Sequence, residues 1–143
     1  MSSNLILTAI RKISMKIKLL FILFLFVSNI AYSQQFYRAK TFSFTTIKTN
    51  ERWKPWSRPE MIDASIEVDS ANSCILLYTN KIQVYSIYKT DKFINDGEIM
   101  YWYYCEDKDK ILCQVQLVLD RNGYNKNEIE IRYADLKLKY ELK

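Results

Sequence analysis

Histidine is absent from the sequence, so the commonest general base of enzymes is missing. Its absence excludes Ser-His-Asp and Cys-His nucleophilic arrangements and every histidine-based metal site. Glycine occurs only twice, which excludes a Gly-rich loop that would cradle a phosphate. The sequence therefore favours a protein that is not an enzyme and holds no cofactor or metal. A hydrolase that works with two carboxylates and no histidine, as in glycoside hydrolysis, is the remote alternative.

Long hydrophobic runs are also missing. The most apolar run, 19–27, has nine residues, whereas about 20 are needed to span a bilayer as a helix. It follows two lysines and precedes the small residues Ala31 and Ser33, which is the pattern of a signal peptide and its cleavage site. We therefore expect residues 1–33 to be a signal peptide, with Met15 as an alternative start. The protein would then be periplasmic or extracellular, without a stable membrane anchor after cleavage.

The excess of basic residues belongs mostly to this leader. The whole chain has a net charge of +5, but four of its 21 basic residues and none of its 16 acidic residues lie in 1–33. The remaining segment, 34–143, has 17 basic and 16 acidic residues. A nearly neutral segment gives no basis for predicting a nucleic-acid partner. Its length suits a single domain with one core.

Apolar and polar residues alternate with period two along most of this segment, which is typical of strands with one buried face. The clearest example is 61–69, where Ile62, Ala64, Ile66 and Val68 share one face. The runs that we expect to form strands are 35–47, 61–69, 74–78, 82–88, 99–105, 111–119 and 128–142. Residues 89–97 read as a polar loop. The alternation changes phase at 134–135, as a β-bulge or a sharp kink would produce.

Consecutive short strands with tight connections favour an all-β, antiparallel meander of seven to eight strands that closes into a small barrel. A two-sheet β-sandwich is the alternative. An eight-strand barrel has an interior just wide enough to be filled by side chains or to hold one small ligand. The many large side chains at inward positions favour a filled interior.

The hairpin predicted at 99–119 contains two of the three cysteines. If the charged break 106–110 is its turn, Cys105 and Cys113 lie directly opposite each other on the buried face. An exported protein meets an oxidising compartment, so we expect a disulfide between them, which leaves Cys74 as a free thiol. The alternative is a pair of reduced, buried thiols that pack as small hydrophobic groups.

The loop 49–59 contains both prolines, which cannot donate to a strand ladder. It carries Trp53 and Trp56 beside Arg52, and rigid aromatic rings with basic neighbours suit a sugar face, an anionic ligand or a protein partner. If the loop lies at the mouth of the barrel, these three residues are candidate contacts. The alternative is that both rings fold back over the core as a plug, with an arginine stacked on one of them.

A second candidate surface is the hairpin face opposite the cysteines. Met100, Trp102 and Tyr104 share it by alternation. A small barrel does not normally leave such side chains bare, so they are further candidate contacts with a ligand or partner.

Several motifs resemble those of a group of small exported proteins of Bacteroidetes-type bacteria. They are W-K-P-W-S at 53–57, I-E-V-D-S at 66–70, I-Q-V-Y-S-I at 82–87 and Y-Y-C-E-D-K-D-K-I-L-C-Q-V-Q-L at 103–117. The likeness covers about 36–140 and implies export and a β fold, without implying a function. The chain departs from the group in lacking a glycine in the charged turn. It resembles lipocalin-type barrels only in strand number, because the G-x-W signature is absent.

These features lead to one expected function and one alternative. We expect an exported, non-enzymatic module of the cell envelope or the extracellular space that has a structural role or interacts with a protein. The alternative is a lipocalin-like barrel that binds a small apolar or amphipathic ligand.

Overall fold

The structure is a computed structural model that describes residues 15–18, 34–48, 50–123 and 126–143. The predicted signal peptide, 1–33, lies outside the described residues except for 15–18, which are helical. The strands described below belong to one compact unit, Gln35–Lys143, which is separate from the unit that contains residues 15–18. Within the described ranges, no helix is long and apolar enough to cross a membrane.

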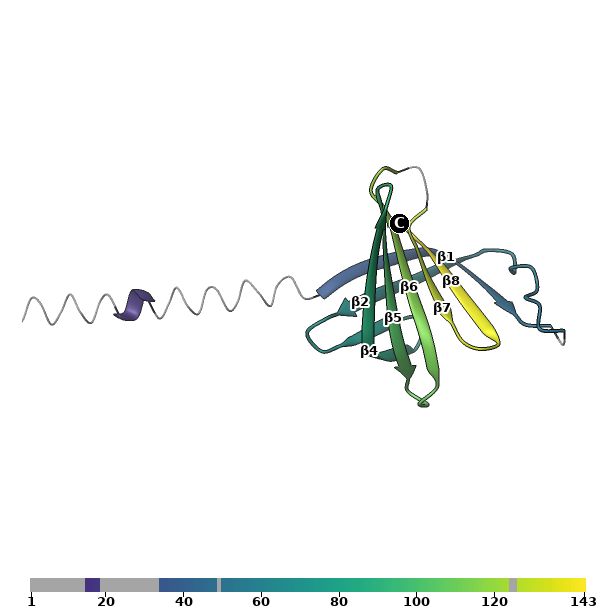
Figure 1. The fold of residues 1–143 in the computed structure, drawn as a ribbon, viewed down its shortest axis with the longest axis horizontal. Coiled ribbons are helices and arrows are strands. Elements are labelled where there is room, and N and C mark those ends of the chain that lie inside the picture. The colour runs from purple at the N-terminus through teal and green to yellow at the C-terminus, as the bar shows by residue number, and fades with distance from the viewer. Residues whose placement is uncertain (1–14, 19–33, 49, 124–125) are drawn as a thin grey trace, which may run out of the picture. The chain divides into compact units, whose positions relative to one another are not determined.

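Eight antiparallel strands follow one another around a closed barrel (Figure 1). They are β1 (Gln34–Thr46), β2 (Glu60–Asp69), β3 (Cys74–Tyr78), β4 (Ile82–Asn95), β5 (Glu98–Asp107), β6 (Leu112–Asp120), β7 (Glu128–Arg132) and β8 (Leu136–Leu142). Each strand pairs with the next one in sequence, and β8 returns to β1, with Phe42 opposite Tyr140. The predicted all-β meander barrel is therefore confirmed, and the two-sheet sandwich is wrong.

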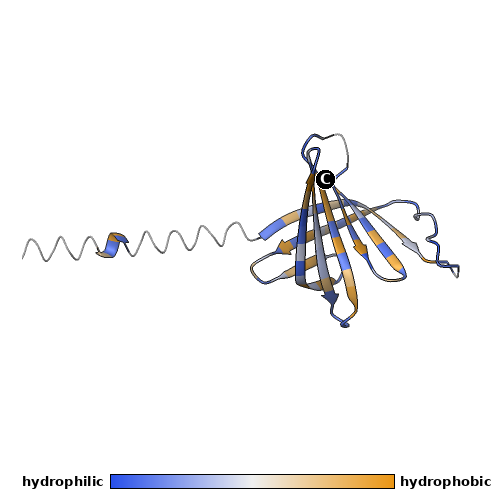
Figure 2. Cartoon of the chain, viewed as in Figure 1, coloured by the Kyte–Doolittle hydropathy of each residue, from blue (hydrophilic) through white to orange (hydrophobic). Residues whose placement is uncertain are grey.

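The period-two pattern explains why these residues form a barrel rather than a flat sheet. Hydrophobic and hydrophilic bands alternate along the strands (Figure 2), so each strand has one face to bury. Closure buries all of these faces against one another and leaves no open sheet edge for another chain to pair with.

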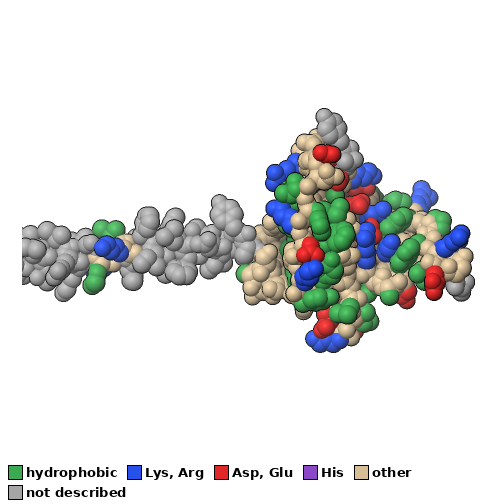
Figure 3. All heavy atoms as spheres, in the orientation of Figure 1, with side chains coloured by type: hydrophobic (Ala, Val, Ile, Leu, Met, Phe, Trp, Pro, Cys, Tyr) green, Lys and Arg blue, Asp and Glu red, His purple; other side chains and the backbone are tan. Residues whose placement is uncertain are grey.

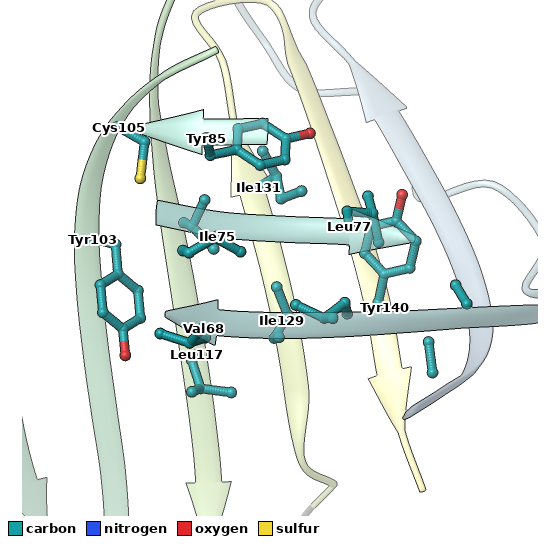
Figure 4. Close-up of a cluster of buried hydrophobic side chains, with 14 of the residues drawn as sticks. Val68, Ile75, Leu77, Tyr85, Tyr103, Cys105, Leu117, Ile129, Ile131 and Tyr140 are labelled. Carbon is teal, nitrogen blue, oxygen red and sulfur yellow. The ribbon is translucent and has the colours of Figure 1, made fainter. Parts of the chain in front are cut away.

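The interior of the barrel is filled by side chains. One cluster of sixteen buried residues occupies it, and Figure 4 shows Tyr85, Tyr103 and Tyr140 pointing inward among the aliphatic side chains. Of the pockets among the described residues, two touch the buried Tyr85 and Tyr103 at the border of this cluster, two others do not touch it, and none of the four reaches Val115 or Leu117. The predicted filled interior agrees with this packing.

Two local predictions are wrong. Residues 89–95, expected to be loop, continue β4 and pair with β5 from Lys89 opposite Tyr104 to Asn95 opposite Glu98. Backbone pairing within this long hairpin outweighs the polar character of the segment. The phase change at 134–135 is a tight turn between β7 and β8 rather than a bulge, because Arg132 pairs with Lys137 across it.

The β4–β5 turn depends on glycine. Asp96 and Gly97 have φ values of 44° and 85°, and two consecutive positive values are typical of a type I′ hairpin turn. The β6–β7 loop packs on this turn, where the Nδ2 of Asn122 donates to the carbonyl oxygen of Asp96 at 3.2 Å. A Cβ atom at position 97 would clash with the Asn122 amide.

The substitution Gly97→Ala should therefore lower the free energy of unfolding by about 2–3 kcal/mol. Left-handed backbone costs an alanine about 1–2 kcal/mol, and displacing Asn122 breaks a hydrogen bond worth about 1 kcal/mol. The matched control is Gly123→Ala, since Gly123 has a φ of 73° with no atom within 4 Å of the added Cβ. Urea unfolding of both variants measures the difference; equal losses would contradict a role for Asn122.

Candidate functional site

The outward side chains of β4 to β8 form one continuous wall. Strand pairing places them in cross-strand rows, of which the central one contains Asp91, Trp102, Gln116, Glu130 and Lys139. Figure 3 shows hydrophobic side chains gathered over β4 to β6, with lysine and arginine side chains beside them over β7 and β8. The wall is thus aromatic at one end and charged at the other.

The aromatic end consists of Tyr88, Phe93, Met100, Trp102 and Tyr104, which we call the aromatic face. Tyr88 and Phe93 are 62% and 47% exposed, and the other three are half-buried. The Phe93 and Trp102 rings lie 5.0 Å apart, and those of Tyr88 and Tyr104 lie 6.4 Å apart. The predicted contacts on β5 therefore lie on the wall, opposite the cysteines, and β4 adds two rings to them.

A bulge in β4 brings Phe93 to this face. The pairing of β4 with β5 shifts between Ile87 and Lys89, so residues after the shift change sides. Tyr85 is buried inside the barrel, whereas Phe93, which strict alternation would place on the same side, points outward and contacts Trp102. Phe93 could not be predicted as a contact from the sequence, because the polar residues around it are typical of a loop.

Two buried polar atoms at the centre of the wall have no hydrogen-bond partner in the described part of the chain. They are the Nε1 of Trp102 and the Oε1 of Gln116, and the two residues are directly paired across β5 and β6. The Nε2 of the same glutamine donates to the Met100 sulfur at 3.0 Å. A donor and an acceptor are thus left unsatisfied side by side, which costs about 1–3 kcal/mol for each group.

The loop that carries Trp53 and Trp56 folds back along the last residues of β1. The backbone nitrogen of Ser57 donates to the Phe44 carbonyl oxygen at 2.8 Å, and that of Lys54 donates to the Thr46 carbonyl oxygen at 2.9 Å. These bonds hold the loop beside the outward face of β1 and β8.

Both tryptophan rings pack under lysines of β8. The Nζ of Lys137 lies 4.2 Å from the ring centroid of Trp53, and the Nζ of Lys139 lies 4.1 Å from that of Trp56. Alternation with the buried Tyr140 places both lysines on the outside of the barrel. The predicted plug over the core is therefore wrong.

The cations over these rings come from β8 rather than from an arginine of the loop. Arg52 is exposed, and its carbonyl oxygen accepts a hydrogen bond from the Lys48 nitrogen at 2.6 Å within the tight turn of the loop. The structure thus brings Trp53 and Trp56 together with β8 and leaves the Arg52 side chain at the surface.

A hollow of about 190 Å³ opens beside Trp56, and we call it the Trp56 hollow. It is lined by Thr41, Ser43, Trp56, Pro59, Lys126, Glu128, Lys139 and Glu141. Of these residues only Trp56 was a candidate from the sequence. The others come from three strands and two loops, so no local pattern reveals that they meet.

The cysteine pair has the predicted register and no disulfide. Cys105 lies directly opposite Cys113, but both are free thiols in the structure, as is Cys74. Burial raises the pKa of Cys105 to about 12 and that of Cys113 to about 11. Burial thus disfavours the thiolate, which is the reactive form, and the two side chains pack as small hydrophobic groups.

Cys74 is the half-exposed thiol, and its surroundings do not suit a nucleophile. Burial, followed by the negative charges of Asp69 and Glu67, raises its pKa, whereas a reactive cysteine requires a lowered one. In the ranges that the structure describes, no group of three or more histidine, cysteine, aspartate or glutamate side chains could hold a metal ion.

The outer wall, with the aromatic face and the Trp56 hollow, is therefore the candidate site. In comparisons with known proteins, no protein family, no curated protein and no solved structure matches the chain.

Proposed function

We propose that the chain is an exported, non-enzymatic binding module whose aromatic face docks a protein partner. The observation that carries this proposal is the concentration of exposed apolar side chains on β4. Among the residues that the structure describes, five of the thirteen exposed large hydrophobic side chains belong to this strand. They are Ile82, Val84, Tyr88, Phe93 and Ile94, and two of them, Tyr88 and Phe93, belong to the aromatic face.

The composition of the aromatic face supports a protein as the occupant. Aromatic residues and methionine are enriched at the centre of protein interfaces, and contiguous exposed apolar surface marks interaction sites. Lys89 lies over the Tyr104 ring at 4.8 Å and pairs with Asp91 at 2.9 Å, which gives the apolar centre a polar rim. The Nε1 of Trp102 and the Oε1 of Gln116 are buried without hydrogen-bond partners among the described residues. Such groups favour a surface whose side chains rearrange when a partner protein covers it.

The filled interior supports an outer binding surface over the lipocalin-like alternative. A ligand inside the barrel would have to displace side chains such as Leu117 and Ile129, which are 0% and 1% exposed. At the barrel end that Tyr101 and Tyr103 line, the pocket has a volume of only about 160 Å³.

The double variant Tyr88→Ser/Phe93→Ser should lose its partner. Both side chains are exposed, so the barrel should remain folded, while loss of two aromatic contacts should weaken binding by about tenfold or more. The measurement is affinity capture from envelope and extracellular fractions of the native cells, with quantitative mass spectrometry.

The matched control is Phe36→Ser/Met61→Ser, because these side chains are 65% and 82% exposed and belong to β1 and β2. A protein that binds the wild type and the control but not the first variant supports the proposal. Identical captured sets for the two variants would overturn it.

A further inference from the structure

The Trp56 hollow lies between two loops on the outside of β7, β8 and β1. Trp56 and Pro59 line it from the β1–β2 loop, and Lys126 lines it from the β6–β7 loop. Glu128, Glu141 and Thr41 stand in one cross-strand row between these loops. The hollow therefore combines a flat apolar side with hydroxyl, ammonium and carboxylate groups.

The charges around the hollow are unequally compensated. Glu141 is bridged by Lys40 at 2.6 Å and by Lys126 at 2.9 Å, and hydrogen bonds from these two lysines lower its pKa. Glu128, directly opposite Glu141, forms no ion pair within the described part of the chain. Its carboxylate therefore has acceptor oxygens that are not used by the protein.

Burial affects the ionisation of the Glu128 carboxyl group. Loss of solvent raises the pKa of its carboxyl group, and the nearby Lys139 opposes this shift. A half-buried carboxylate without an ion-pair partner is stabilised by hydrogen-bond donors that enter from outside. A ligand that fills the hollow should therefore present hydroxyl or amide hydrogens towards Glu128.

The same groups argue against a strongly charged ligand. An anion would meet the carboxylates of Glu128 and Glu141, and a cation would meet Lys126 and Lys139. An uncharged ligand with one apolar face and a rim of hydroxyl groups matches all of them. Its apolar face can lie against Trp56 and Pro59, while its hydroxyl groups donate to Glu128 and accept from Lys126.

We propose that the Trp56 hollow binds one pyranose ring of an uncharged carbohydrate, with the ring against Trp56 and its hydroxyl groups bonded to Glu128. A free sugar and the end of a glycan chain present the same pyranose ring, so the same contacts in the hollow would bind either of them. The site shares no residue with the aromatic face and stands independently of the proposed protein partner.

The test is a titration of the full chain with methyl glycosides of glucose, galactose, mannose and N-acetylglucosamine, followed by NMR of the tryptophan indole signals. We expect a saturable shift of the Trp56 signal with at least one of them, with a Kd of about 1 mM, typical of weak ligands of this size. An oligosaccharide ending in the same ring distinguishes the two sources: equal affinity indicates a single-ring site, and tighter binding indicates a glycan chain.

Two variants and one control localise the binding, and their affinities are measured from the saturation-transfer NMR signals of the glycoside, because Trp56→Ala removes its own indole signal. Trp56→Ala should abolish it, and Glu128→Gln, which keeps the shape but removes the charge, should weaken it by about tenfold. Trp53→Ala is the matched control, because Trp53 packs under a lysine in the same loop but does not line the hollow. The proposal is overturned if no glycoside gives a saturable shift, or if Trp53→Ala and Trp56→Ala weaken binding equally.

Discussion

Replacing Leu117 by alanine should lower the free energy of unfolding by about 2–5 kcal/mol, the range for a buried leucine that leaves a cavity. Leu117 lies in β6, is 0% exposed and pairs with Tyr101 on one side and Ile129 on the other. The backbone around it is a closed ring of hydrogen-bonded strands. Because such a ring cannot move inward without breaking strand pairs, the cavity should persist and the loss should fall in the upper part of the range.

The same strand offers the control for this substitution. Leu112 also belongs to β6 but is 62% exposed, so Leu112→Ala should change the free energy of unfolding by about 0.5 kcal/mol or less. Urea unfolding of both variants at equal protein concentration gives the comparison. If Leu117→Ala lost no more stability than Leu112→Ala, the interior would be loosely packed, and an internal ligand site would become the better interpretation.

The barrel could be predicted from the sequence because its main determinant is local. Side-chain alternation in β2 already places Ile66 and Val68 on the inward face, whereas the burial of Glu67 and Asp69 on the opposite face does not follow from alternation. The charged turn after β5 likewise fixes the register that places Cys105 opposite Cys113. Alternation fails where a strand changes phase, and the bulge after Ile87 is such a place.

The candidate site could be predicted only in part, because its contacts join distant segments. Trp53 and Trp56 were recognisable as unusual, but the lysines that cover them, Lys137 and Lys139, follow about 80 residues later in the sequence. Their meeting depends on β8 pairing with β1 to close the barrel. No property of the loop itself indicates that closure will bring β8 beneath it.

The filled interior also predicts that alkaline pH should unfold the barrel. Burial raises the pKa of Tyr140 to about 12, and it also raises the pKa values of Tyr85 and Tyr103. In the unfolded chain these hydroxyl groups titrate near their ordinary pKa of about 10. The unfolded state therefore loses protons first, and stability that is fully present below about pH 10 should fall as the pH rises through the folded-state values.

The loss should be large because several groups act together. Tyr140 alone should contribute about 2 kcal/mol between pH 9 and pH 12, and the two other buried tyrosines act in the same direction. Since a domain of this size has a total stability of about 5–15 kcal/mol, cooperative unfolding should occur near pH 11 to 12. Urea unfolding at increasing pH, together with the ultraviolet absorbance of tyrosinate, measures both the loss and the titration.

The variant Tyr140→Phe separates two causes of unfolding at high pH. One is the ionisation of buried tyrosine hydroxyl groups, and the other is repulsion between negative charges over the whole protein. It removes the titrating hydroxyl group of a ring that is 4% exposed while keeping its packing against Phe42, whose ring centroid lies 5.1 Å away. The variant should match the wild type near pH 8 and lose about 2 kcal/mol less than the wild type by pH 12. Tyr88→Phe is the control, because it removes the same hydroxyl group from a side chain that is 62% exposed. If Tyr140→Phe and Tyr88→Phe follow the wild-type curve alike, burial of tyrosine hydroxyl groups is not what limits the stability of the barrel in alkali.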